Sequence, residues 1–260
     1  MKKQIYKEQE LPLADLERIG LAKNGRLKLG EDDLGALLSG RRTEMLRLEN
    51  LQAEGLYIPA LDAKLSLRPN ASGVLELLVH PIYKEIGPPY YLTAEEAQQL
   101  EKGGQVNIDK IIVDKDGNAK EVLVEFDSET NEFIITDTEK ILAPEEINGL
   151  PLTAEQKEKY RKGKEVETAD GTTIQYTAKD KHGVRSDRLA LIASVLIDGG
   201  VSYLLFKGLN ALFNKPQKKE PGANYKKAVA DISGSRISQT TGTYRPANDQ
   251  TEEQTVSISR

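Results

Sequence analysis

Hydrophobic and polar residues alternate along three stretches of the chain with the period of two that β-strands show. The stretch "LDAKLSLRPNASGVLELLVH", which begins at Leu61, alternates around the turn sequence "PNASG" and predicts an antiparallel hairpin. The stretch "KIIVDKDGNAKEVLVEFDSETNEFIIT", from Lys110, predicts a three-strand meander because two turn sequences divide it. A shorter hairpin is predicted for "TTIQYTAKDKHGVRS", which begins at Thr172.

A short helix with the same capping residues is predicted ahead of two of these strand sets. The strings "LTAEEAQQLEKGGQV" and "LTAEQKEKYRKGKEV" each place a threonine, Thr93 or Thr153, at the N-cap, with Glu or Gln three residues later in a capping box. Each helix is expected to end at a glycine, Gly103 or Gly163, in the left-handed C-cap conformation. The string "LGEDDLGALLSGRRT" is a third, more diverged copy in which glycine replaces the threonine.

Helices that alternate with antiparallel strand sets predict an α+β fold, in which short capped helices pack on the sheets. The copies are unevenly spaced, at roughly 60 residues, which favours two or three related subdomains over a regular solenoid. We divide the chain into an N-terminal α+β subdomain (1–91), a helix with a three-strand meander (92–151), a helix with a hairpin (152–188), an apolar segment (189–213) and a polar tail (214–260). The tail has few large apolar residues, so we predict that it is disordered.

The apolar segment 189–213, "LALIASVLIDGGVSYLLFKGLNALF", predicts a helix, or a helical hairpin broken at its Gly-Gly pair. On a helix, small and polar residues at four-residue steps would form one stripe suited to close packing. The residues of this stripe are Ala190, Ser194, Asp198 and Ser202. Burial within the protein or between copies of the chain is favoured, because an aspartate near the centre opposes membrane insertion. Insertion stays open as the alternative, since the segment is nearly long enough to span a bilayer.

The charges of the chain are unevenly distributed. Up to Gln156 there are 18 Lys and Arg residues against 29 Asp and Glu residues, and beyond it 18 against 12. The basic C-terminal part can attract nucleic-acid phosphate or lipid headgroups, although a solvated charge pattern explains the same composition. The candidate phosphate-contacting residues are Arg41, Arg42, Arg47, Lys179, Lys181, Arg185 and Arg188. Few aromatic residues are interleaved with them, and no helix-turn-helix or zinc-finger pattern is legible.

Cellular location is indicated by what the sequence lacks. There are no cysteines, which excludes disulfides and thiolate metal sites and suits a reducing compartment. The opening "MKKQIYKEQELPL" has no apolar stretch after its lysines, so we expect neither a signal peptide nor an N-terminal anchor. The expected location is the cytoplasm, with the cytoplasmic face of the inner membrane as the alternative.

Candidate catalytic chemistry is sparse in the sequence. His80 and His182 have no further ligand at helical spacing, so we expect no metal and no other cofactor, and we assign His80 to a strand edge or core. No G-x-S-x-G, P-loop or G-x-G-x-x-G motif occurs. The string "DKDGNAKEVLVE" places Asp114 and Glu125 at the ends of a calcium-type loop, but its Gly117 stands at the fourth position instead of the sixth, which favours a hairpin turn.

Several strings together resemble a known group of proteins: "LGALLSGRRTEMLRLENL", "LDAKLSLRP", "LELLVHPIY", "VLVEFDSETNEFIITDTEKI" and "LTAEQKEKYRKGKEV". The group is carried on conjugative and mobilisable elements of Bacteroides-type bacteria and is built from domains of unknown function in which "LTxEQ…KGKEV" units recur. The resemblance spans Leu11 to Phe213. It implies a cargo or accessory protein of a mobile element, and it supplies no catalytic residues.

Duplicated units, the lack of a recognised catalytic motif and this resemblance predict a non-enzymatic binding or scaffold module of a mobile element. Its expected partner is a protein or nucleoprotein, and the apolar segment is expected to support self-association. Two alternatives stay open: a membrane-tethered accessory protein of a conjugative transfer apparatus, and a DNA-processing accessory protein that contacts nucleic acid directly.

Overall fold

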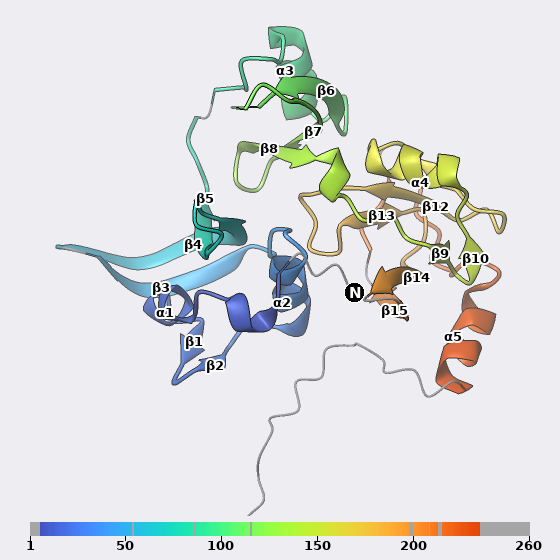
Figure 1. The fold of residues 1–260 in the computed structure, drawn as a ribbon, viewed down its shortest axis with the longest axis horizontal. Helices are drawn as coiled ribbons and strands as arrows, with labels where there is room; N and C mark the ends of the chain where they lie inside the picture. The colour runs from blue at the N-terminus through green and yellow to red at the C-terminus, as the bar shows by residue number, and fades with distance from the viewer. Residues whose placement is uncertain are drawn as a thin grey trace, which may run out of the picture.

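The computed structural model describes residues 6–53, 55–85, 87–114, 116–197, 200–207, 209–212 and 215–234. Short helices and small antiparallel sheets are arranged in three units, which follow one another along the chain (Figure 1). The predicted α+β fold class is therefore confirmed. Each unit has its own cluster of buried hydrophobic residues.

The first unit packs short helices on one face of a three-stranded sheet, in the order β3-β4-β5. Its inner face presents Ala63, Leu65 and Leu67 to a core that includes Leu16 and Leu37 of the helices. The pairing of β4 with β5 confirms the first predicted hairpin, whereas β3 is a strand that the sequence reasoning did not identify. The elements are η1 (Glu8–Glu10), α1 (Leu13–Arg18), β1 (Ala22–Lys23), β2 (Arg26–Leu27), α2 (Glu31–Leu38), β3 (Leu46–Ala53), β4 (Leu56–Pro69) and β5 (Leu75–Pro81).

The second unit is one helix on a three-stranded sheet in the order β6-β7-β8, which confirms the predicted meander. Its elements are α3 (Ala94–Glu101), β6 (Ile108–Val113), β7 (Ala119–Asp127), β8 (Glu132–Asp137) and η2 (Thr138–Lys140). The central strand β7 is buried on both faces. Val122, Val124 and Phe126 belong to the core beneath α3, while Leu123 belongs to the core of the third unit. The sheet of the second unit thus serves two cores.

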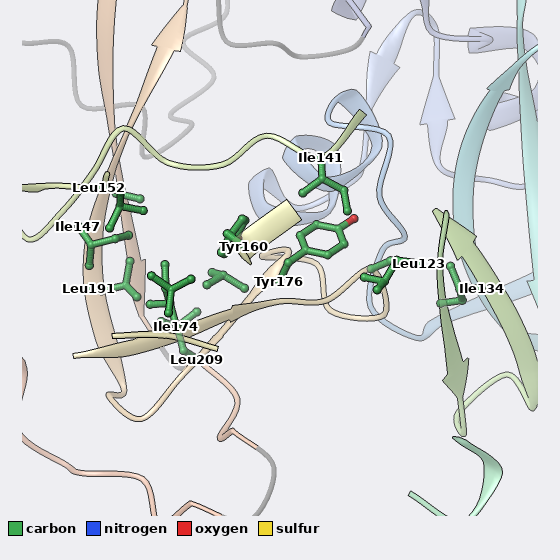
Figure 2. Packing of buried hydrophobic residues seen from close by; sticks show 14 residues of the cluster. Leu123, Ile134, Ile141, Ile147, Leu152, Tyr160, Ile174, Tyr176, Leu191 and Leu209 are labelled. Carbon is green, nitrogen blue, oxygen red and sulfur yellow. The ribbon is translucent and has the colours of Figure 1, made fainter. Parts of the chain in front are cut away.

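The third unit contains two small sheets, ordered β11-β12-β13 and β10-β9-β14-β15. Figure 2 shows its core, which extends from Leu123 and Ile134 of the second unit through Tyr176 to Ile147 and Leu191. The third predicted hairpin is formed by β12 and β13. The elements are β9 (Glu146–Ile147), β10 (Leu150–Pro151), α4 (Ala154–Arg161), β11 (Val166–Glu167), β12 (Thr173–Tyr176), β13 (Val184–Ser186), β14 (Ala190–Ile197), β15 (Gly200–Lys207) and α5 (Tyr225–Gly234).

The repeated helices α3 and α4 begin and end in the same way. The hydroxyls of Thr93 and Thr153 each accept a hydrogen bond from the backbone N–H three residues on, at 3.2 and 3.1 Å, and both capping boxes are complete. Gly103 and Gly163 follow the helices with φ of 68° and 64°, in the left-handed region. Helix α2 ends similarly at Gly40, with φ of 67°. The repeated strings therefore encode a repeated backbone geometry.

The prediction of an apolar helix or helical hairpin over 189–213 is wrong. Ala190–Ile197 and Gly200–Lys207 form antiparallel strands, paired from Ala190↔Lys207 to Ile197↔Gly200, and β14 also pairs with β9. An apolar run of this length cannot be assigned to helix or strand from periodicity alone, and here it forms two strands that pair with each other and with β9. No helix within the described residues is long and apolar enough to span a membrane.

The helical stripe predicted along this segment does not form. Ala190 and Ser194 lie on β14, where the buried Ser194 side chain has no hydrogen-bond partner among the described residues. Ser202 lies on β15, where its Cα pairs with Val195. Asp198 lies outside the described residues. Self-association through a helical face is therefore no longer supported.

The prediction of a disordered tail is wrong for residues 215–234. The side-chain amide of Gln217 donates to the carbonyl of Leu209 at 2.6 Å, and the backbone N–H of Lys218 donates to the carbonyl of Asp187 at 2.7 Å. The segment continues into α5, whose Ala228 is buried. Composition missed this segment because hydrogen bonds hold it in addition to the little apolar surface that it buries. Residues 235–260 lie outside the described residues.

Replacing Gly222 by Ala should weaken the docking of this C-terminal segment. A Cβ atom at Gly222 would lie less than 3.0 Å from Thr172 Oγ1, Asp170 Oδ2 and Asn148 Nδ2. We expect the free energy of unfolding to fall by about 1–2 kcal/mol in urea denaturation, because overpacking is relieved once the segment detaches. Gly87→Ala is the control, since a Cβ there meets no atom within 4 Å. Equal stabilities of the two variants would contradict the docking.

Candidate functional site at the junction of the three units

The turn that joins β7 to β8 covers the part of the outer face of β4 and β5 that holds Lys64 and His80. The backbone N–H of Tyr83 donates to the carbonyl of Thr130 at 3.0 Å, and the side-chain amide of Asn131 donates to the carbonyl of Tyr83 at 2.9 Å. Asn131 has φ of 56°, which turns the chain tightly at this contact. The turn thereby brings acidic side chains of the second unit against basic side chains of the first.

Lys64 of β4 is the central cation of this junction and is only 1% exposed. Its Nζ donates to Asp127 Oδ2 at 2.9 Å and to the carbonyl of Lys179 at 3.2 Å, and it lies 2.6 Å from Glu129 Oε2. These acceptors match the three N–H donors of an ammonium group. The side chain therefore ties the first unit to two residues of the second unit and one of the third.

Arg42 forms a second buried ion pair beside Lys64. Its Nη2 donates to Glu132 Oε1 at 2.5 Å, and its Nη1 donates to Thr130 Oγ1 at 3.3 Å. Burial alone would raise the pKa of Glu132, but hydrogen bonds from His80 and Arg42 outweigh it and lower the pKa to about 2. Glu132 is therefore a carboxylate, which only accepts hydrogen bonds, at any pH near neutrality.

A chain of hydrogen bonds leads from Glu132 through His80 to Ser66. His80 Nδ1 lies 3.2 Å from Glu132 Oε1, and His80 Nε2 lies 2.8 Å from Ser66 Oγ. Because Glu132 can only accept, Nδ1 carries the proton; in the neutral imidazole Nε2 is then the acceptor and the Ser66 hydroxyl donates to it. Ser66 and His80 lie on the neighbouring strands β4 and β5, while Glu132 comes from β8.

Strand β7 carries a second buried carboxylate besides Asp127. This is Glu125, which faces the third unit. It accepts hydrogen bonds from Thr177 Oγ1 at 2.7 Å and from the backbone N–H of Ala178 at 2.5 Å. Burial raises its pKa, and burial also lowers the pKa of the neighbouring Lys179, whose Nζ donates to the carbonyl of Phe126. Glu125 holds the third unit to β7, so it is not part of a calcium-type loop.

The turn at Asp114 has the geometry of a hairpin connection. Asp114 Oδ1 accepts hydrogen bonds from the backbone N–H groups of Asp116 and Asn118, both at 2.9 Å, and Gly117 has φ of 83°. These bonds occupy the carboxylate that a calcium loop would use first. Within the described residues, no group of three or more His, Asp or Glu side chains could hold a metal ion.

Most of the seven cations predicted to contact phosphate are engaged in contacts within the protein. Arg41 donates to the carbonyl of Lys181, while Arg42 and Lys179 are engaged in the junction. The remaining side chains lie elsewhere: Arg47 pairs with Asp62, Lys181 lies near Asp32 and Glu44, Arg188 donates to the carbonyl of Glu220, and Arg185 Nε is buried without a hydrogen-bond partner among the described residues. Phosphate contact by these residues stays a prediction, and the structure does not gather them into one basic surface.

Sequence reasoning missed the residues that the junction brings together. Ser66, Asp127 and Glu132 were not singled out, and Lys64 was treated as a polar residue of an alternating strand. Its position on the polar face of β4 gives no local sign that another unit covers that face. The one available sequence signal is the apolar run Val122-Leu123-Val124 in β7, which is typical of a strand buried on both faces.

Comparison with known proteins finds a family model that matches the first unit. Residues 6–88 match a family model described as "Protein of unknown function (DUF4099)". The matched segment contains α1 to β5 and thus supplies Arg42, Lys64, Ser66 and His80 to the junction. No curated protein and no solved structure matches the chain.

Proposed function

We propose that this protein is a binding or scaffold module that engages a protein partner through the edge strand β6. The observation that carries the proposal is the exposure of Ile111 and Val113, which are 77% and 64% exposed. The two residues are two positions apart on one strand, so their side chains lie on the same face of the sheet. Exposed apolar side chains on an unprotected edge are typical of a surface that another chain covers.

The backbone of β6 supports the same proposal. Among the described strands β6 pairs only with β7, because the sheet order is β6-β7-β8. Its other side can accept an extended segment by strand addition, in which main-chain hydrogen bonds give affinity and alternate side chains give specificity. The proposed ligand is therefore an extended protein segment with apolar residues at alternate positions.

The charges around β6 favour a protein segment over nucleic acid. Lys110 donates to Glu96 at 2.6 Å, and Lys164 donates to Asp109 at 2.8 Å, so both charged residues of the strand are paired. An edge without an unpaired cation offers little to a phosphate backbone. A nucleoprotein complex would accordingly be engaged through its protein component.

The biological setting that we propose is a bacterial mobile element of the Bacteroides type, in the cytoplasm. The mobile element is supported by the strings between Leu11 and Phe213 that resemble proteins of such elements. The cytoplasm is supported by the absence of cysteines, which suits a reducing compartment. The helix on which the membrane-tethered alternative rested is replaced by β14 and β15. Direct DNA contact has less support because most of the candidate cations are engaged in contacts within the protein.

The experiment is a selection of phage-displayed peptides against the whole protein, followed by binding of the enriched peptides in solution. We expect peptides with alternating apolar residues, and we expect the Ile111→Lys/Val113→Lys variant to bind them at least tenfold more weakly, a change of about 1.4 kcal/mol. Val74→Lys is the control, because Val74 is equally exposed (62%) but lies on the turn before β5.

A second readout locates the bound peptide. Strand addition should slow hydrogen exchange of backbone amides in β6, since they gain hydrogen-bond partners. Enriched peptides that bind the β6 variant and the parent equally would refute the proposal. So would a preference of the protein for single- or double-stranded DNA that survives the β6 substitutions while peptides fail to bind.

A further inference from the structure

We propose that Ser66 is an activated nucleophile that accepts the acyl group of carboxylic esters, with His80 as general base and Glu132 as the group that orients the base. The proposal goes beyond the binding role of β6 and does not depend on it. Three residues of these types, connected in this order, form the arrangement that nucleophilic serine catalysis requires. Such an arrangement is recognised by geometry, since unrelated folds assemble it from residues in different sequence order.

The distances and proton positions fit the roles. The Ser66 Oγ to His80 Nε2 distance of 2.8 Å is within the range for a nucleophile and its base, and the His80 Nδ1 to Glu132 Oε1 distance of 3.2 Å is at its upper end. A carboxylate at Glu132 holds the Nδ1 proton, which leaves the Nε2 lone pair facing the serine hydroxyl. This is the tautomer in which a histidine can remove the serine proton.

The supporting residues hold the base in place without enclosing the nucleophile. His80 is 9% exposed, and Glu132 is fixed by Arg42, itself buried, at 2.5 Å. Ser66 is only half-buried, so a small ester can reach its hydroxyl. The arrangement therefore has a rigid inner end and an accessible outer end.

An exposed cation lies on the face of the sheet that carries Ser66. Arg68 follows Ser66 by two residues on β4, so both side chains lie on the same face of the sheet. Its guanidinium is exposed and lies 3.5 Å from Glu76, a loose contact that it can exchange for an oxyanion. Stabilisation of the oxyanion by an exposed arginine predicts slow acyl transfer, in contrast to a preorganised oxyanion hole.

The reaction proceeds in two balanced steps. Ser66 Oγ attacks the carbonyl carbon of the ester while His80 Nε2 takes the hydroxyl proton, and a tetrahedral oxyanion forms. The bond from carbon to the alcohol oxygen then breaks, the leaving alcohol receives the proton from His80, and the acyl group remains on Ser66. Water, deprotonated by the same His80, attacks the acyl-serine and releases a carboxylic acid, which restores the Ser66 hydroxyl with the returned proton.

The test is covalent labelling of the full chain with a fluorophosphonate, which transfers its phosphonyl group to a nucleophilic serine and releases fluoride. We expect a single adduct, mapped by peptide mass spectrometry to Ser66, and none in Ser66→Ala. The labelling rate should fall at least about 100-fold in His80→Gln, because a general base contributes at least that factor. The matched control Ser72→Ala, at an exposed turn serine of the same unit, should leave the rate unchanged.

The parent protein provides a test that does not require a folded His80 variant. The parent should release p-nitrophenol from p-nitrophenyl acetate. Prior labelling of Ser66 with the fluorophosphonate should abolish that release, because both reagents need the same hydroxyl. Three results would each overturn the proposal. The first is a label spread evenly over many residues, and the second is a labelling rate at Ser66 that His80→Gln does not change. The third is the absence of any adduct on this protein under conditions in which the same reagent labels a known serine hydrolase.

Discussion

Replacement of Lys64 by Met should lower the free energy of unfolding by about 3–5 kcal/mol, the usual effect of breaking a buried ion pair by removing one partner. Methionine fills a similar volume, so the loss reflects charge and hydrogen bonding more than packing. Asp127, which is 1% exposed, would keep its charge while losing the Lys64 ammonium at 2.9 Å. Arg42 at 3.8 Å from Asp127 replaces only part of that interaction. Urea denaturation of the variant measures the effect.

An exposed ion pair on the same sheet provides the control for Lys64. Arg47 donates to both carboxylate oxygens of Asp62 at 3.1 and 2.9 Å, but its side chain is 60% exposed. Arg47→Met should therefore change the free energy of unfolding by at most about 1 kcal/mol. The double variant Lys64→Met/Asp127→Asn should recover part of the loss, because no buried charge is left unpaired. A loss below 1 kcal/mol in Lys64→Met alone would show that the junction does not hold the units together.

The contrast between Arg47 and Lys64 also shows where sequence reasoning reaches its limit. Alternation along β4 predicted the strand, its partner β5 and the face that each side chain takes, and the structure confirms the hairpin. Alternation says that a face is polar, but it does not say whether water or another unit covers it. Arg47 and Lys64 both lie on the polar face of the sheet, and the β7–β8 turn covers Lys64 but leaves Arg47 exposed.

The serine, histidine and glutamate of the junction were beyond sequence reasoning for a related reason. Ser66 and His80 are brought together by strand pairing, which the predicted hairpin contained, but Glu132 arrives from a different unit. The search for local motifs could not find a set whose third member is contributed by tertiary docking. His80 was assigned to an edge or core strand, and it does lie on β5, yet its two nitrogen contacts were invisible from sequence.

The capped helices were predictable because their signals are local. A threonine followed by Glu or Gln at the third position defines the start, and glycine defines the end, with no help from distant residues. The prediction for 189–213 was wrong for the opposite reason. Its apolar run fits helix and strand equally, and the pairing of β14 with β15 and β9 appears only in the fold. Local signals thus gave the helices, and tertiary pairing determined the C-terminal strands.

Gly163→Ala should lower the free energy of unfolding by about 2–5 kcal/mol, more than the same change at Gly103. Both glycines end a repeated helix at almost the same φ, so the penalty for a left-handed alanine, about 1–2 kcal/mol, is common to both. At Gly163 a Cβ would also lie 2.6 Å from Asn107 Nδ2 and 2.9 Å from Leu123 Cδ1, where the second unit packs on the third. Overpacking of this kind adds about 1–3 kcal/mol.

Gly103 is the matched control, because a Cβ built there meets no atom within 4 Å. The difference between the two variants in urea denaturation isolates the contact between the units from the backbone strain. Gly163 also accepts hydrogen bonds at its carbonyl from Asn107 at 2.9 Å and Gln175 at 2.8 Å, so displacement of the helix end would loosen both. If both variants lost the same free energy of unfolding, the packing of the second unit on the third at Gly163 would add nothing to stability. The two repeated helices would then end in equivalent surroundings.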